Sequence, residues 1–144
     1  ARFVEHTTGL KMKEIYAMET KHGNPVKDGN LKMAASMMFS LENNAVGCIV
    51  SNYLNMNNFP TWGNEHLRVW GTNGFVEITD GLTKTRLVTP DYDGPVEIKH
   101  KSIDYFDFFI DEILYKKPMP LTLEEELHPL RMVIRAQKSA VEVE

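Results

Sequence analysis

Cysteine is almost absent from this sequence: Cys48 is the only one among 144 residues. A disulfide framework within the chain and a cysteine-rich zinc site are therefore excluded. A chain with so few thiols suits a reducing compartment, and we expect a cytoplasmic protein. Cys48 itself lies in an apolar stretch without charged neighbours, which predicts an inert thiol buried in the core.

Long hydrophobic runs and an excess of basic residues are also missing. A run such as Ala45–Val50 is far shorter than the ~18 residues that suggest a membrane span. Sixteen Lys and Arg against twenty Asp and Glu give a net charge of −4. Because duplex binding is led by basic groups that displace counterions from phosphate, this balance argues against nucleic acid. The sequence therefore predicts neither a membrane nor a nucleic-acid partner.

Self-contained catalytic and cofactor signatures are missing as well. There is no P-loop, and Gly71 and Gly74 form only a G-x-x-G pair inside an expected hairpin, which is not the context of a dinucleotide fingerprint. The five histidines lack the paired spacing of metal ligands. They are His6, His22, His66, His100 and His128. We accordingly assign no catalytic, cofactor-binding or metal-binding residue to this chain.

Composition and length are those of an ordinary globular domain, with 42% hydrophobic and 25% charged residues. A chain of this size buries roughly 68–70% of the surface that it exposes when unfolded. Residues 1–144 are therefore expected to form one domain with a core of its own.

Strand patterns dominate the first two thirds of the chain. The clearest is the alternation over 31–41, in which Met33, Met37 and Phe39 share one face with other apolar residues. The turn that follows contains two asparagines, which tolerate positive φ, so Ala45–Leu54 should pair antiparallel with this strand. Further strands are expected at 12–20, 66–70, 75–79, 82–88 and 96–99.

Helical periodicity takes over after residue 102. An apolar face at helical spacing is predicted for the first helix, made of Phe106, Phe109, Ile110, Ile113 and Leu114. Thr122 and Glu125 have the spacing of a capping box, and the second predicted face is Leu123, Leu127, Leu130 and Ile134. Strands first and helices last indicate an α+β fold: a large, mainly antiparallel or mixed open sheet with helices on one face.

The loop between 55 and 66 differs from the rest because it combines amides with aromatic rings. Amides can hydrogen-bond hydroxyl groups and aromatic faces can cover the C–H face of a sugar ring, so the loop suits a polyhydroxylated ligand. The predicted substrate contacts are Asn55, Asn57, Trp62, Asn64 and His66. The competing interpretation is a surface loop whose asparagines serve turns and whose aromatics cap the edge of a sheet.

Four segments of the sequence together carry a family resemblance. The segment 65–74 reads EHLRVWGTNG and resembles the R-V-x-G-x-x-G hairpin of the Gfo/Idh/MocA oxidoreductases. Three others agree with the family in order and spacing: 41–53 (LENNAVGCIVSNY), 105–112 (YFDFFIDE), and the P-x-P-L-T-x-E-E-E stretch that leads to 136–140. They cover almost the whole chain and match the family's C-terminal domain, which resembles the C-terminal fold of glyceraldehyde-3-phosphate dehydrogenase.

The resemblance implies a two-domain parent. An N-terminal Rossmann domain would bind NAD or NADP, and the C-terminal sheet would pack against neighbouring subunits and shape the substrate pocket. The family's nicotinamide-binding glycine motif, E-K-P lysine and D-x-x-x-H pair would all fall upstream of Ala1. The fragment alone is then expected to bind no cofactor and to be inactive. The loop 55–64 matches the family in position but not in residues, and the resemblance carries no proton-transfer role onto His66.

Three functions remain open at this stage. The first is the C-terminal substrate-binding and oligomerisation domain of an NAD(P)-dependent dehydrogenase that acts on a sugar, inositol or related polyol. The second is a non-catalytic module that dimerises through one face of the sheet, for which the small and apolar side of 31–41 is suited. The third is one half of an enzyme that uses bound NAD for glycoside cleavage.

Overall fold

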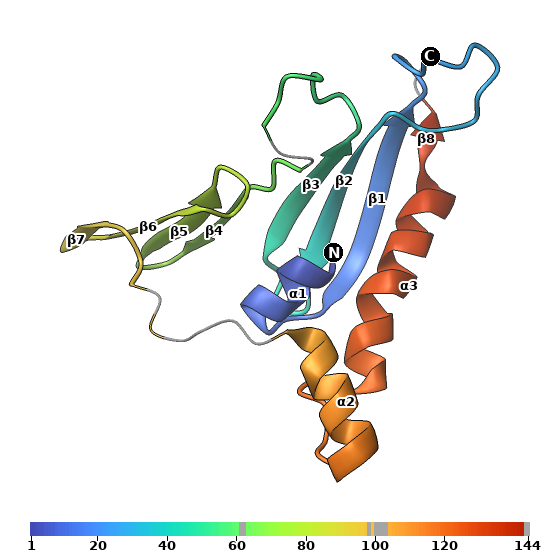
Figure 1. The fold of residues 1–144 in the computed structure, drawn as a ribbon. Coiled ribbons are helices and arrows are strands. Elements are labelled where there is room, and N and C mark those ends of the chain that lie inside the picture. The colour runs from blue at the N-terminus through green and yellow to red at the C-terminus, as the bar shows by residue number, and fades with distance from the viewer. Residues whose placement is uncertain (61–62, 98, 100–103, 143–144) are drawn as a thin grey trace. The chain divides into compact units, whose positions relative to one another are not determined.

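The computed structural model describes residues 1–60, 63–97, 99 and 104–142. The chain divides into two compact units: the first combines Ala1–Leu54 with Phe106–Glu144, and the second is Asn55–Tyr105. The second unit is thus inserted in the sequence between two parts of the first. Figure 1, coloured by residue number, shows this order along the chain.

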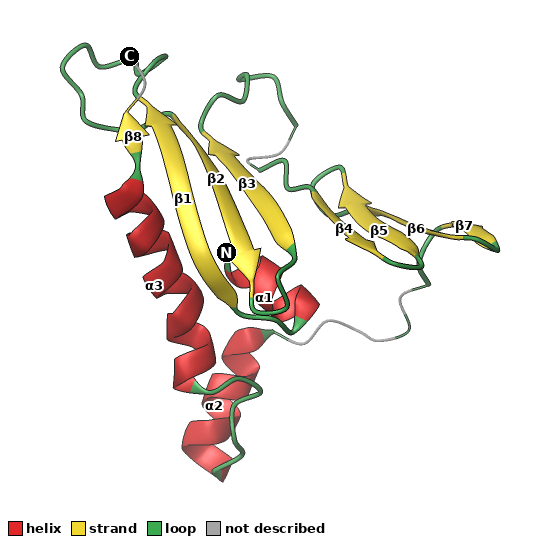
Figure 2. Ribbon diagram, turned by 180° about the vertical axis from the view of Figure 1, so that it is seen from behind, coloured by secondary structure: helices red, strands yellow, loops and turns green. Residues whose placement is uncertain are grey.

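The first unit is built on a four-stranded sheet, sheet A, with helices packed against it (Figure 2). Its elements are α1 (Arg2–Thr8), β1 (Met12–Thr20), β2 (Ala34–Leu41), β3 (Val46–Asn52), α2 (Tyr105–Tyr115), α3 (Leu123–Ser139) and β8 (Val141–Glu142). The strand order is β3-β2-β1-β8, where β1, β2 and β3 are antiparallel neighbours and β8 pairs parallel to β1. Sheet A is therefore mixed.

The alternation along β2 distributes its side chains over two faces of sheet A, as the sequence predicts. On the inner face Phe39 is the partner of Ile15 on β1 and of Gly47 on β3. On the other face Met38 lies between β1 and β3 residues that are exposed like itself. This second surface, the open face of sheet A, consists of Tyr16, Met18, Met38, Cys48 and Val50.

The core lies between the inner face of sheet A and the helices α1 and α3. Met12, Ile15 and Phe39 pack there with Met132 of α3, which is only 1% exposed. Phe39 also explains the glycine beside it, because a Cβ at Gly47 would come within 2.3 Å of the Phe39 ring. Burial on this one face is what orients α1 and α3 on the sheet.

Cys48 is exposed, which makes the prediction of a buried thiol wrong. Its partner on β2 is Met38, so it belongs to the open face and not to the core. Alternate residues of this strand face opposite sides of the sheet. Because residues on both sides are apolar, the sequence pattern does not indicate which side Cys48 faces.

The two predicted helices are confirmed, but their predicted apolar faces are not buried in this chain. In α2 no residue is buried, and Phe109 and Ile113 are exposed. In α3 the buried residues are Pro129, Met132 and Ala136, on a different stripe from the predicted one. Leu130, which belongs to the predicted stripe, is exposed. Helical spacing found both helices but did not identify which side meets the sheet.

The second unit is a four-stranded antiparallel meander, sheet B. Its strands are β4 (Leu67–Gly71), β5 (Gly74–Thr79), β6 (Lys84–Thr89) and β7 (Tyr92–Gly94), in the order β4-β5-β6-β7. The strand predicted at 96–99 is wrong for the described residues Val96, Glu97 and Lys99, which are not in a strand. The last strand is β7 instead, because the chain turns back directly after Thr89.

The predicted α+β class is confirmed. The strands form two four-stranded sheets where the pattern predicted one large sheet. The α1 and α3 helices pack on one face of sheet A, in agreement with the prediction. In the part of the chain that the structure describes, no helix combines the length and apolarity that crossing a bilayer requires.

Candidate substrate-side site

The predicted substrate contacts belong to the second unit, on the segment that leads into β4. Asn55, Asn57, Asn64 and His66 are exposed there, and Trp62 lies outside the described residues. Asn57 sits in a turn closed by the Phe59 N–H, which donates to the Met56 carbonyl at 2.9 Å. An asparagine in a turn is what the competing interpretation of this loop expects, and its exposed amide is also available to a ligand.

His66 is brought to a group of charged residues that crosses sheet B. This charge ladder consists of Arg68 on β4, Glu77 on β5, Arg86 on β6 and Asp93 on β7. Arg68 donates from Nε to Glu77 Oε2 at 2.7 Å and also from Nη2 to the same oxygen. Arg86 Nη1 lies 3.9 Å from Glu77 Oε1, and His66 Nε2 lies 3.9 Å from Oε2.

The outer end of the charge ladder is a two-point pair. Arg86 donates from Nε to Asp93 Oδ1 and from Nη2 to Oδ2, each at 2.7 Å. These hydrogen bonds hold the pKa of Asp93 below its ordinary value and raise the pKa of Arg86. Bidentate geometry of this kind fixes the guanidinium plane as well as its position.

Glu77 stands at the centre of the charge ladder and is the buried charged residue among those described, at 8% exposure. Its partner Arg68 also has aromatic neighbours, because the guanidinium lies 5.5 Å from the Trp70 ring and 5.3 Å from the Phe75 ring. The ladder alternates positive and negative groups, so its charges compensate one another. It therefore provides a fixed base for neighbouring side chains such as His66.

A recess of about 350 Å³ opens beside the charge ladder. Thr79, Lys84 and Thr85 contribute to its walls together with members of the ladder. Lys84 is paired with Asp80 at 2.7 Å, and this hydrogen bond raises the pKa of the amine. Hydroxyl and amine donors around an open recess can bind the hydroxyl groups of a small molecule.

Sequence reasoning missed the charge ladder, although its signal is present. Arg68 and Glu77 are equidistant from the β4–β5 turn, and Glu77 and Arg86 are equidistant from the β5–β6 turn. Residues placed in this way across a hairpin are direct cross-strand partners on one face. Opposite charges at these positions therefore indicate a ladder once both turns are located.

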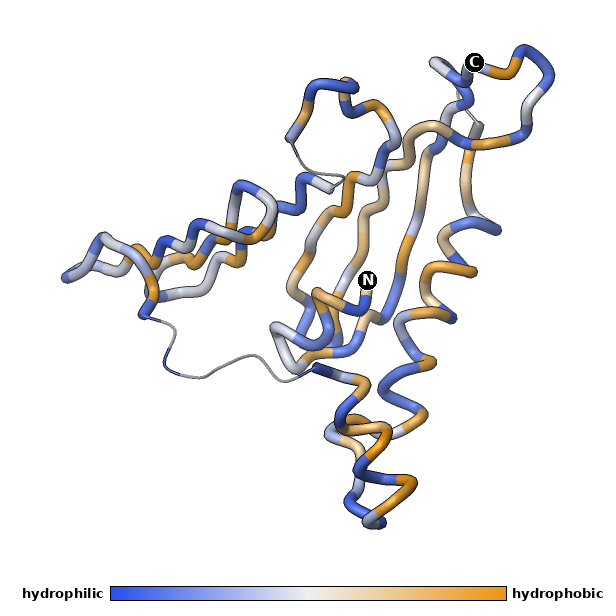
Figure 3. The backbone as a smooth tube through the Cα atoms, in the orientation of Figure 1, coloured by the Kyte–Doolittle hydropathy of each residue, from blue (hydrophilic) through white to orange (hydrophobic). Residues whose placement is uncertain are grey.

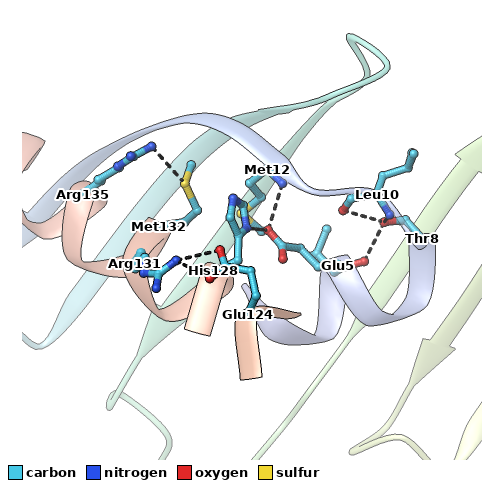
Figure 4. Close-up of polar contacts among 10 residues, drawn as sticks. Glu5, Thr8, Leu10, Met12, Glu124, His128, Arg131, Met132 and Arg135 are labelled. Carbon is cyan, nitrogen blue, oxygen red and sulfur yellow. Dashed lines mark hydrogen bonds and ion pairs between the residues drawn. The ribbon is translucent and has the colours of Figure 1, made fainter. Parts of the chain in front are cut away.

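The first unit has a polar contact of its own, which joins α1, β1 and α3 (Figure 4). Glu5 Oε1 accepts a hydrogen bond from the Met12 N–H at 2.9 Å and lies 2.8 Å from His128 Nδ1. The side chains of Glu5 and His128 are largely buried. A cavity of about 140 Å³ lies beside them, between α1 and α3. The contact fastens α1 to the core. Within the described residues no three His, Cys, Asp or Glu side chains are arranged to hold a metal ion.

Solved structures, and not sequences, show which known proteins this chain is similar to. No protein-family model matches the sequence, and no curated protein is significantly similar to it. A protein from Thermotoga maritima that is described as an oxidoreductase is 25% identical to this chain, with a TM-score of 0.86. The match covers 96% of this chain and 41% of that one. A second protein described as an oxidoreductase, from Erwinia carotovora atroseptica, is 17% identical with a TM-score of 0.82. That match covers 99% of this chain and 45% of the other.

A third similar structure is an aldose-aldose oxidoreductase from Caulobacter crescentus in complex with glycerol. It is 19% identical with a TM-score of 0.75, and the match covers 96% of this chain and 42% of that one. All three structures have the Gfo/Idh/MocA architecture that the sequence resembles. The chain has the fold of a Gfo/Idh/MocA-type C-terminal domain.

The chain spans less than half the length of the solved structures that it matches. Two further similar structures contain nicotinamide cofactors. One is a biliverdin reductase from Synechocystis with biliverdin and NADP+, and the other is an oxidoreductase from Agrobacterium radiobacter with NAD+, L-tartaric acid and magnesium.

Proposed function

We propose that residues 1–144 are the C-terminal substrate-binding and oligomerisation domain of an NAD(P)-dependent oxidoreductase that acts on a sugar, inositol or related polyol. The observation that carries this proposal is the match of 96% of the chain, at a TM-score of 0.86, to 41% of an oxidoreductase. A separate Rossmann domain would account for most of the remaining length and would hold the cofactor. The NADP+ and NAD+ in two similar structures support this choice of cofactor.

The substrate class rests on the loop 55–66 and on the neighbours. One similar structure is an aldose-aldose oxidoreductase, and another is a UDP-N-acetylglucosamine 3-dehydrogenase from Acidithiobacillus ferrooxidans. Both names describe carbohydrate chemistry. The exposed amides of Asn55, Asn57 and Asn64 would hydrogen-bond substrate hydroxyls, Trp62 would cover a C–H face, and His66 would contact the substrate from its position beside Glu77.

Two described features bear on whether this chain would hold the dinucleotide itself. A pyrophosphate is bound where a glycine-rich turn leads from a strand into an open helix N-terminus. Gly71 and Gly74 instead join two antiparallel strands. The N-terminus of α3 is closed by its own capping box, in which Thr122 and Glu125 bond each other's backbone N–H. In this proposal hydride and proton transfer use groups outside the chain, and the residues present bind and orient the substrate.

Self-association is proposed for the open face of sheet A. Tyr16, Met38 and Val50 are each more than 60% exposed on this face, and exposed apolar surfaces of this kind mark interfaces between proteins. The occupant in this proposal is the same face of a second copy. A cytoplasmic location is part of the proposal because the chain has a single cysteine, which suits a reducing compartment.

The decisive experiment adds the segment encoded upstream of residue 1 and screens polyols and sugars for reduction of NAD+ or NADP+. Reduction with at least one polyol is expected. Replacement of His66 by Ala should then raise the KM for the polyol about tenfold, the effect of losing one hydrogen bond to the substrate. The KM for the nicotinamide cofactor should not change.

Asn43→Ala is the matched control, because Asn43 lies in the β2–β3 turn and its side chain accepts only a local hydrogen bond from the Ala45 N–H. A reading frame without an upstream dinucleotide-binding domain would sink the proposal and leave the non-catalytic dimerisation module. Glycoside hydrolysis without net reduction of the cofactor would instead favour the NAD-assisted glycosidase.

A further inference from the structure

The apolar face of α2 is uncovered although its sequence is that of a packed helix. Phe109, Ile113 and Leu114 are 45%, 51% and 62% exposed. Figure 3 shows hydrophobic residues repeated along α2. Phe106 continues the face by one turn, and its ring lies 5.9 Å from that of Phe109. A helix with such a stripe normally buries it against another surface.

The helix is otherwise well defined, which indicates that its exposure is not the result of fraying. The Lys116 N–H donates to the Glu112 carbonyl at 3.0 Å, and Lys116 itself has a positive φ of 57° that ends the helix. Lys117 Nζ lies 2.7 Å from Asp111 Oδ2. This hydrogen bond also raises the pKa of Lys117. The polar side of α2 therefore has local partners, while the apolar side offers its surface outward.

Helix length gives the second argument. Helices shorter than ~12–15 residues are marginal in water without tertiary packing. The α2 helix has 11 residues and none is buried. Its stability therefore requires a surface that the other described residues of the first unit do not supply.

The length of the similar structures indicates where a surface for α2 can come from. The chain matches 41–45% of the first two similar structures over nearly its whole length, so more than half of each such protein lies outside the matched region. Phe109, Ile113 and Leu114 together offer on the order of 300 Å², about half of each large side chain. Interfaces between domains of one chain bury roughly 300–750 Å² per side. The face of α2 reaches the lower end of that range.

We infer that the apolar face of α2, made of Phe109, Ile113 and Leu114, docks onto the cofactor-binding domain of the parent enzyme. This inference rests on the proposed function and names the surface that joins its two domains. A second copy of the chain is the less suitable occupant, because the open face of sheet A offers a wider apolar surface for self-association.

Hydrogen exchange tests the inference without reference to activity. The amides of residues 109–115 should exchange at least tenfold more slowly in the chain that carries the upstream segment than in the 144-residue chain. Phe109→Asp should restore fast exchange in the longer chain, because a charge cannot be buried in the contact. The same substitution should leave the unfolding midpoint of the 144-residue chain unchanged. Glu112→Gln, on the exposed polar side of α2, is the matched control and should alter neither.

Three results would overturn the inference. Equal exchange of α2 in both chains, with the longer chain still reducing nicotinamide, refutes this docking surface and leaves the proposed function intact. A large loss of stability in the 144-residue Phe109→Asp variant shows that the face is buried within the chain. Protection of α2 that rises with the concentration of the 144-residue chain assigns the face to a second copy. An upstream segment without a cofactor domain removes the proposed function itself.

Discussion

The two units of this chain are stabilised by different forces. In the first, sheet A and its helices bury a cluster of aliphatic and aromatic side chains around Phe39 and Met132. In the second, Glu77 is the buried residue among those described, and it lies within a ladder of ion pairs. Apolar burial resists salt and pH, whereas ion pairs at a surface are weakened by both. The first unit should therefore hold its fold under conditions that loosen the second.

The largest effect is expected from the core of the first unit. Phe39→Ala removes a ring that is 7% exposed and should lower the free energy of unfolding by about 3–5 kcal/mol. Chemical denaturation monitored by circular dichroism measures this change. Met38→Ala is the matched control: the neighbouring residue lies on the open face, 68% exposed, and its substitution should cost far less when the chain is dilute. Equal losses would contradict the assignment of the two faces.

An intermediate effect is expected from the charge ladder. Glu77→Gln removes the carboxylate that accepts from Arg68, and the loss of a charge-assisted hydrogen bond of this kind should destabilise sheet B by about 1.5–3 kcal/mol. Hydrogen exchange of the β5 amides should accelerate, while that of the β1 amides should not. Glu97→Gln, at an exposed position in the same unit, should leave both unchanged. Acceleration in β1 as well would show that the units unfold together.

A smaller effect is expected at the start of α3, which belongs to the first unit but depends on polar contacts. The Thr122 side chain accepts from the Glu125 N–H, and Glu125 Oε2 accepts from the Thr122 N–H at 2.7 Å. Thr122→Ala should cost about 1 kcal/mol of unfolding free energy. Thr122→Ser, which keeps the hydroxyl, should restore most of it. A full loss in the serine variant would mean that the methyl group, and not the cap, stabilises this end.

The smallest effect is a pH dependence of the same helix start. Hydrogen bonds from Thr122 hold the pKa of Glu125 below its ordinary value of 4.5, and the hydrogen bond from Arg131 lowers the pKa of Glu124. A carboxyl whose folded pKa is depressed contributes stability above its unfolded pKa and loses it as the pH falls through the folded value. Stability should therefore decrease below pH 4.5. Glu125→Gln should flatten this decrease, and an unchanged acid limb would count against the cap.

The sequence predicted best those features that depend on strand alternation and caps. The two faces of β2 and the Thr122 capping box both follow from local spacing, and the structure confirms them. The prediction of a buried Cys48 is wrong because the face of this residue depends on its pairing with Met38 across a turn. A uniformly apolar segment does not indicate that register. The buried stripe of α3 was misplaced for a similar reason, since Met132 and Leu130 are equally apolar.

The candidate site was predictable only in part. The loop residues Asn55, Asn57 and Asn64 are exposed as expected of ligand contacts, but their roles remain predictions because exposure alone does not select a ligand. The position of His66 beside Glu77 depends on the register of the β4–β5 hairpin, which brings together residues that are distant in sequence. In the proposed function the residues that bind the cofactor belong to a separate domain of the parent, so the sequence of this chain predicts no position for it.

The pairing of β1 with β8 has a consequence for how this protein folds. Val141 is the partner of Met18, so the edge strand of sheet A and its neighbour are far apart in the sequence. Closing a contact over so long a separation is slow, because the intervening chain loses conformational freedom before the contact forms. On the ribosome, β1, β2 and β3 can assemble early, but β8 can join the sheet only after residues 141–142 have been made. Sheet B, whose strands are all close in sequence, has formed its hairpins by then.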